Sequence, residues 1–230
     1  MDERAPPDPL DLNQIVSLPQ EKQSISILQW LVDCESFLVN SSPEQVSEHQ
    51  QTFRQAFINL LSLPTPPLGR VLRNCLGRCF SDIFSRGDRK VLFDTVTTLL
   101  QKVAHVRNDK ETKQKQCEPL LLSKRMLLTC YSATVFCLGV ILAVAGDSVM
   151  QLIPEVVSAL IRIIRASQMD VGIRAIAFAS LRKAFIKQGH IKDENMGRDL
   201  IKITRHGLAD KSHIIQLRAA QVSSYIDAEI

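Results

Sequence analysis

The residues most able to do chemistry in this sequence are its cysteines and histidines, and their spacing argues against a metal site. The six cysteines and five histidines are dispersed along 230 residues. Cys75 and Cys79 stand four positions apart, but no C-x-x-C pair or spaced histidine pair completes a zinc set. All cysteines except Cys117 lie in apolar helical patterns, which predicts small core residues in a reducing compartment. The histidines are predicted at helix ends or on polar faces: His49, His105, His190, His206 and His213.

Carboxylates and glycine-rich motifs give no catalytic arrangement either. Asp88, Asp94 and Asp109 are predicted at a helix start, on an exposed face and in a loop. The sequence contains no G-x-x-x-x-G-K-[ST], G-x-G-x-x-G, H-E-x-x-H or G-x-S-x-G motif. We therefore predict a protein that is not an enzyme, with no catalytic residue, cofactor, metal site or small-molecule substrate.

Four basic residues are the candidate partner-binding positions. Recognition surfaces of helical-repeat proteins tend to be lined by the second helix of each repeat. Arg73, Arg78, Arg182 and Lys183 are predicted on that side of their helices, where they would meet an acidic peptide. The alternative is that they are ordinary solubilising charges.

Helical periodicity predicts the elements that must position these residues. Apolar residues recur at alternating spacings of three and four, as from Leu68 to Phe84, and no strand alternation is found. Ser42, Pro43 and Gln45 form a capping signature, and two Gly-Asp pairs mark helix breaks. We predict nine helices, at approximately 21–39, 43–62, 67–85, 88–106, 120–145, 148–166, 170–187, 194–208 and 212–228.

A weak internal repeat predicts how these helices are arranged. The segments RVLRNCLGRCF, RMLLTCYSATV, RAIAFASLRKA and RAAQVSSYIDA align on Arg70, Arg125, Arg174 and Arg218, with a small residue five positions after each arginine. These arginines are 55, 49 and 44 residues apart, which is close to the period of about 40 to 47 residues of HEAT and armadillo helix pairs. We predict an all-α fold, an α-solenoid of HEAT/armadillo-like antiparallel helix pairs. It spans 19–230 as the N-terminal part of a longer array, with a flexible lead at 1–18 and a polar loop near 107–118.

The uncharged run from Met126 to Gly146 allows two interpretations. It is long enough for one membrane-spanning helix, which would make the chain a single-span membrane protein. It also falls on the second helix of a predicted repeat, where neighbours would bury it on several sides. A third option is a basic solenoid for nucleic acid or transport cargo, since the net charge is +4. Aromatic residues are only 5% of the chain, which disfavours nucleic acid.

Two stretches, Gln29-Trp30-Leu31 and Leu63 to Val103, resemble the N-terminal region of the very large HEAT-repeat proteins that accompany the trans-Golgi and endosomal clathrin adaptor. The latter holds two prolines, a basic helix, a Gly-Asp turn and a Phe-containing helix. Members of that family carry polar and aromatic side chains where this chain has Val140 to Ala145, so the chain departs from the family pattern there. Because polar side chains in the relatives argue for a soluble helix at this place, the resemblance favours the buried interpretation.

The resemblance implies a scaffold that binds the clathrin adaptor and its accessory proteins and supports adaptor recruitment and protein sorting between trans-Golgi and endosomes. The expected location is cytoplasmic, peripheral at the trans-Golgi network, endosomes and clathrin-coated vesicles, with membrane association through partners. Homo-oligomer formation through the longer chain stays open.

Overall fold

Helices form every regular element in the described part of the chain. The computed structural model describes residues 5–63, 65–112, 120–166, 170–185 and 194–226. Within these ranges the structure contains no strand, so the predicted all-α class is confirmed. The elements are α1 (Leu12–Ser17), α2 (Gln20–Asn40), α3 (Pro43–Leu60), α4 (Arg70–Arg86), α5 (Arg89–Thr112), α6 (Leu120–Ala145), the 3-10 helix η2 (Gly146–Leu152), α7 (Ile153–Arg165), α8 (Val171–Phe185), α9 (Glu194–Leu208) and α10 (His213–Ile226).

A short helix, α1, lies inside the segment that we predicted to be a flexible lead. The Asp11 side chain caps it by accepting hydrogen bonds from the backbone N–H groups of Asn13 and Gln14. Ahead of α1, the backbone carbonyl of Asp8 accepts a hydrogen bond of 2.9 Å from the Trp30 indole on α2. Six residues are too few to show helical periodicity, so sequence patterning does not reveal α1.

Two predicted boundaries differ from the structure by more than three residues. Helix α5 extends to Thr112, six residues beyond the predicted end at 106, because this polar stretch contains neither Gly nor Pro to stop it. The predicted polar loop therefore loses its first half, and its remainder, 113–118, lies outside the described residues. The helix predicted at 148–166 begins as α7 only at Ile153, since Val149 has non-helical dihedral angles within η2.

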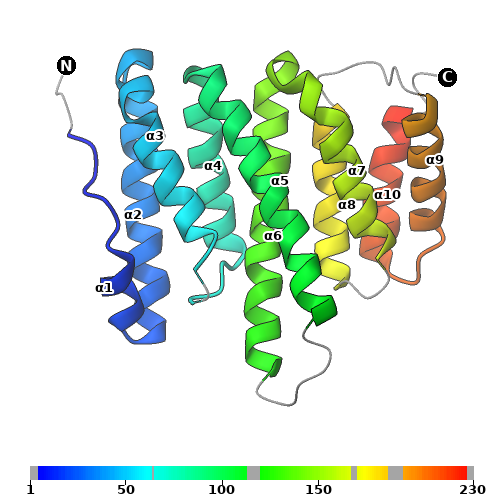
Figure 1. Cartoon of the computed structure of the whole chain (residues 1–230), viewed down its shortest axis with the longest axis horizontal. Coiled ribbons are helices and arrows are strands. Elements are labelled where there is room, and N and C mark those ends of the chain that lie inside the picture. The colour runs from blue at the N-terminus through cyan, green and yellow to red at the C-terminus, as the bar shows by residue number, and fades with distance from the viewer. Residues whose placement is uncertain (1–4, 64, 113–119, 167–169, 186–193, 227–230) are drawn as a thin grey trace.

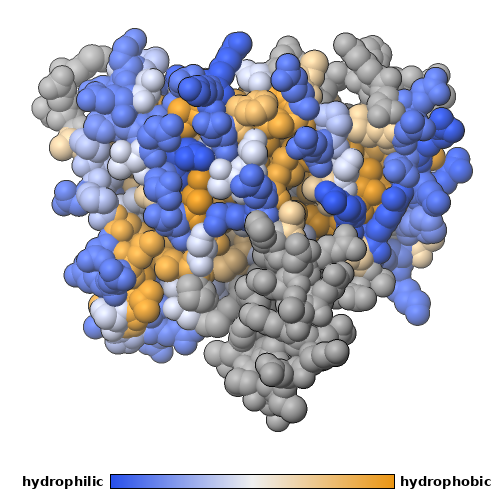
Figure 2. Space-filling view, in the orientation of Figure 1, coloured by the Kyte–Doolittle hydropathy of each residue, from blue (hydrophilic) through white to orange (hydrophobic). Residues whose placement is uncertain are grey.

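The helices form two layers. The even-numbered helices α2, α4, α6, α8 and α10 pack side by side in that order, and α3, α5, α7 and α9 cover them (Figure 1). The four arginine-led segments aligned in the sequence lie on α4, α6, α8 and α10. The internal repeat therefore corresponds to successive helices of one layer, which we call the even layer. Seen from the other layer, hydrophilic side chains cover much of the described surface, and hydrophobic ones show between them and gather at the lower left of the view, where Figure 1 draws α1 (Figure 2).

Helix α6 is the central member of the even layer and carries the uncharged run. It packs against α4 and α8 within its layer and against α5 in front. Its window Leu128–Ala145 has a mean hydropathy of 2.1 and is long and apolar enough to cross a membrane. In this structure 61% of that window is buried inside the protein, and Val135, Leu138 and Ile141 are fully buried.

Missing side chains let α6 approach its neighbours closely. A Cβ atom on Gly139 would lie 2.5 Å from the Ser180 Cβ and 2.7 Å from the Ser180 Cα on α8. The Ser180 hydroxyl uses this proximity to donate a hydrogen bond of 2.9 Å to the Val135 carbonyl. On the other side of α6, a Cβ on Gly77 of α4 would meet the Phe136 ring at 2.8 Å. Glycine at these two positions therefore sets the spacing of α4, α6 and α8.

Substituting Gly139 with Ala should destabilise the protein. The added methyl group would press on the backbone of α8, which cannot move without shifting the whole layer, so we expect a loss of about 2 kcal/mol in the free energy of unfolding. Urea unfolding followed by circular dichroism measures it. Gly69→Ala is the matched control because a Cβ there meets no atom within 4 Å, and it should change stability by less than about 1 kcal/mol. Equal losses in the two variants would contradict the close-packing argument.

Candidate functional site: a basic cluster on the even layer

The even layer carries an uneven distribution of charge. Within the bounds given above, α6, α8 and α10 contain no Asp or Glu, and α4 contains only Asp82. Within this layer, carboxylates that could neutralise the basic side chains are therefore limited to Asp82 of α4 and those of α2, and any others come from the turns, the covering helices or a partner. The Lys and Arg residues of these four helices are Arg70, Arg73, Arg78, Arg86, Lys124, Arg125, Arg174, Arg182, Lys183 and Arg218.

Arg78, a predicted partner-binding residue, is already paired. Its guanidinium forms a two-point ion pair with Glu35 of α2, with Nε–Oε1 at 2.6 Å and Nη2–Oε2 at 3.0 Å. The hydrogen bonds from Arg78 lower the pKa of Glu35 below its ordinary value. The charge of Arg78 is thus paired within the protein, and the ion pair joins α2 to α4.

Two further arginines of the layer are engaged in turns. Arg174 donates to the Asp210 carboxylate at 2.7 Å, and both side chains are mostly buried. Asp210 belongs to the turn between α9 and α10, so the bond links α8 to the following helix pair. Arg86 donates to the backbone carbonyl groups of Ser41, at 3.1 Å, and Leu38. These contacts hold successive pairs together and leave little for a partner.

Arg73 and Lys183, two other predicted residues, meet over one aromatic ring. The Arg73 guanidinium carbon lies 5.3 Å from the centroid of the Phe136 ring, and the Lys183 Nζ lies 4.7 Å from it. The two charges, from α4 and α8, are therefore at most about 10 Å apart across α6. Arg73 also donates a hydrogen bond of 3.3 Å to the Ser132 hydroxyl. We call Arg73, Phe136 and Lys183 the cation–ring cluster.

The two cations of the cluster have no anionic partner among the described residues. Neither takes part in an ion pair there, and the Arg73 Nε is buried without a hydrogen-bond acceptor. Burial lowers the pKa of both groups, and the neighbouring charges of Arg70 and Arg218 lower them further. Because desolvated cations gain most from a paired anion, the cluster is suited to bind a carboxylate or phosphate.

Sequence reasoning identified part of this site. It named Arg73 and Lys183, which the fold brings together, and Arg182, which is half-buried beside them in the chain. It missed Phe136, because an aromatic residue within an uncharged run is ordinarily core. Gly77, in the middle of α4, is the signal that could have found it, since a helix-interior glycine often accommodates a bulky neighbour.

Four of the five described cysteines are buried in the core, and Cys130 is half-buried. Cys34, Cys75 and Cys79 are buried between α2 and α4, and the described cysteines are all free thiols. Burial raises the pKa of Cys34 and that of Cys137, the latter to about 12, which keeps these thiols protonated and unreactive. Cys75 donates a hydrogen bond to Glu35 at 3.5 Å. In the described ranges no group of three or more His, Cys, Asp or Glu side chains could hold a metal ion.

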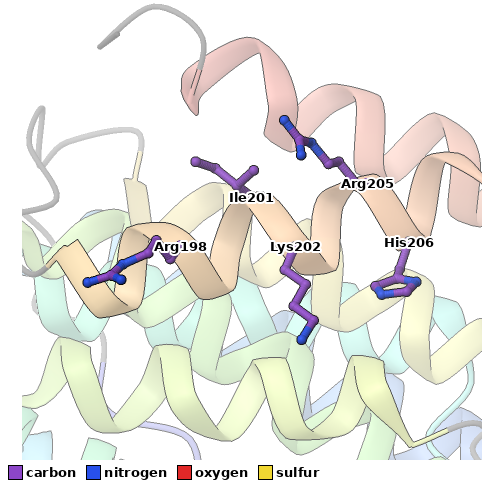
Figure 3. Close-up of a pocket in the computed structure, with 5 residues that line it drawn as sticks. All are labelled: Arg198, Ile201, Lys202, Arg205 and His206. Atoms are coloured by element: carbon purple, nitrogen blue, oxygen red, sulfur yellow. The ribbon is translucent and has the colours of Figure 1, made fainter.

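A second basic surface lies on α9, in the other layer. An open hollow of about 420 Å³ is lined by Arg198, Ile201, Lys202, Arg205 and His206. Lys202 and His206 point to one side of the helix, whereas Ile201 and Arg205 point towards α10 (Figure 3). All five residues belong to one helix, so the hollow has no opposing wall.

Comparison with known proteins gives no relative: no protein-family model, curated protein or solved structure matches the chain. Function must therefore be argued from the residues described above.

The contact between Lys183 and Phe136 should be measurable in a double-mutant cycle. Phe136→Leu keeps most of the packing on Gly77 but removes the ring face, and Lys183→Met removes the charge but keeps the chain length. We expect a coupling energy of about 0.5 to 1 kcal/mol between the two changes in urea unfolding. Pairing Phe136→Leu with Lys90→Met, on the exposed start of α5, should give no coupling. If the stability losses of Phe136→Leu and Lys183→Met were strictly additive, the cation–ring contact would contribute nothing to stability.

The Glu35–Arg78 pair should add a small pH-dependent stability. Because the folded pKa of Glu35 is lowered, its contribution is present above the unfolded pKa of roughly 4.3 and is lost as pH falls through the folded value. Arg78 is 58% exposed, so Glu35→Gln should cost below about 1 kcal/mol at pH 7 and almost nothing near pH 2.5. The control is Glu48→Gln on α3, outside any ion pair in the described ranges. A loss of stability in Glu35→Gln that is as large near pH 2.5 as at pH 7 would refute the ion pair with Arg78.

Proposed function

We propose that the chain is a non-enzymatic helical-repeat scaffold of the HEAT/armadillo-like α-solenoid type that binds acidic segments of partner proteins on its even layer. The observation that carries this proposal is the cation–ring cluster. Arg73 and Lys183 are partly desolvated on a layer whose helices α6, α8 and α10 contribute no carboxylate. An acidic side chain from a partner supplies the missing anion.

The arrangement of helices supports the solenoid type. Each even helix packs on the next, and the odd helices lie over them in the same order. The spacing of the aligned arginines is close to the repeat length of HEAT-like pairs. Such arrays bury each repeat against its neighbours and leave one continuous helical face for recognition.

The partners that we propose are the clathrin adaptor and its accessory proteins. This assignment rests on the resemblance carried by Gln29-Trp30-Leu31 and by Leu63 to Val103, which include parts of α2, α4 and α5. The chain would act in the cytoplasm, at the trans-Golgi network, endosomes and clathrin-coated vesicles, in adaptor recruitment and protein sorting.

The burial of α6 favours this function over a membrane span. Lipid would have to replace the contacts of α6 with α4, α5 and α8 and would break the hydrogen bond from Ser180 to Val135. A nucleic-acid partner is also less suited, because the one ring in the cluster is flanked by two cations and does not offer a stack of open aromatic faces.

Binding of a Glu-rich peptide tests the proposed site. A fluorescein-labelled peptide of twelve residues, half of them Glu, should bind the full chain in low salt, measured by fluorescence anisotropy. Arg73→Gln combined with Lys183→Gln should weaken binding at least about 10-fold, because each removes a charge-assisted contact. Purified clathrin-adaptor accessory proteins should show the same dependence on these two residues.

The matched control is Arg89→Gln combined with Lys90→Gln, which removes the same charge from exposed positions on α5. Its binding should stay within about 2-fold of the unchanged protein, the tolerance expected for distant charges in moderate salt. Equal losses of peptide affinity in the two variants would mean that the peptide responds to the overall positive charge and not to the cation–ring cluster. Tighter binding of an oligonucleotide than of the peptide would reject the protein-scaffold assignment, and failure of every accessory protein to bind would reject the trafficking role.

A further inference from the structure

Helix α9 has two faces of opposite character. Its inward face packs against the rest of the protein. Its outward face presents Arg198, Lys202 and Arg205, which recur at spacings of four and three and which we call the α9 row. Lys202 lies towards one edge of this face and Arg205 towards the edge next to α10 (Figure 3). The buried residues of α9 are Leu200, Ile203, Thr204 and Gly207.

The two carboxylates of α9 do not neutralise this row. Glu194 lies 3.8 Å from Arg198, but the two side chains are 92% and 73% exposed, so water screens their attraction. Asp199 is paired with Arg165 of α7 at 2.6 Å. The acidic residues of the helix are thus at its first turns or engaged by another cation.

The second half of the row is unpaired. Within the ranges that the structure describes, Lys202 and Arg205 form no ion pair, and both are exposed. His206 stands beside Lys202 on the same side of the helix (Figure 3). Toward the other edge of the row lie two aliphatic side chains, Ile201 and, seven residues on, Leu208, which is 43% exposed.

This geometry selects the kind of partner. The hollow among these side chains is lined by α9 alone, so a peptide or nucleotide would find one row of cations and no second wall to hold it. A planar surface with many negative charges can contact the whole row at once. Ile201 is partly buried against the core, whereas Leu208 is exposed, and an exposed aliphatic side chain beside cations is a pattern of helices that lie at a membrane interface.

We propose that the outward face of α9 binds an anionic phospholipid bilayer directly. Arg198, Lys202 and Arg205 pair with lipid phosphate and carboxylate groups, while Leu208 enters the interfacial region. The proposed function brings the chain to membranes only through partners, so this contact goes beyond it. The contact does not use the cation–ring cluster, and either proposal can fail without the other.

Vesicle flotation with the full chain tests this inference. Vesicles of phosphatidylcholine with about 30% phosphatidylserine should carry the protein upward at moderate salt, and pure phosphatidylcholine vesicles should not. Lys202→Glu combined with Arg205→Glu should weaken binding to the anionic vesicles at least about 20-fold. Leu208→Ser alone should weaken it by about 3-fold, because one partly exposed side chain contributes less than two charges.

Two controls separate this surface from general charge and from the even layer. Arg89→Glu with Lys90→Glu reverses as many charges on α5, and Arg73→Gln with Lys183→Gln removes the cluster; both should keep vesicle binding within about 2-fold. Circular dichroism checks that each variant is folded. No binding to anionic vesicles, or an equal loss in the α5 control, would overturn the proposal. So would a Glu-rich peptide in solution that bound with the same dependence on Lys202 and Arg205, since it would make the partner an acidic protein.

Discussion

The structure depends on the burial of one apolar helix between its neighbours. Helix α6 contributes fully buried residues such as Leu138 and Ile141 to contacts with α4, α5 and α8. Burial of this kind stabilises only if the backbones come close, and Gly77 and Gly139 provide that closeness at the two interfaces. Because α6 stands in the middle of the even layer, its packing fixes the distance between the side chains that α4 and α8 present on either side of it.

The sequence predicts most of the helices because burial in a layered helical protein leaves a regular trace. The spacing of apolar residues in α4 and the Ser42 capping box in α3 are local signals, and the structure keeps both. Features that depend on distant contacts leave no such trace. The short α1 is ordered in part by the bond from Trp30 to Asp8, and the end of α5 has no residue that marks a stop.

The same limit applies to the candidate site. Charge and helix position indicate Arg73 and Arg78 equally, yet Glu35 neutralises Arg78 across the α2–α4 interface, whereas Arg73 is left without a carboxylate in the described part of the chain. That difference arises from which helix stands next to each arginine. Sequence patterns thus supply the candidates, and tertiary neighbours decide which of them keep a charge available for a partner.

One property of α6 accounts for both its buried position and the chemistry beside it. A helix with no charge from Met126 to its end at Ala145 can be covered on several sides, and for that reason it offers no carboxylate to the cations that flank it. Arg73 and Lys183 therefore rest on the Phe136 ring, a weaker partner than an anion, and both side chains are half-buried. The run that resembles a membrane span thus forms part of the core. Because it carries no acidic residue, the cations at the centre of the even layer lack an anionic partner, and an anion from a partner protein would be bound most favourably there.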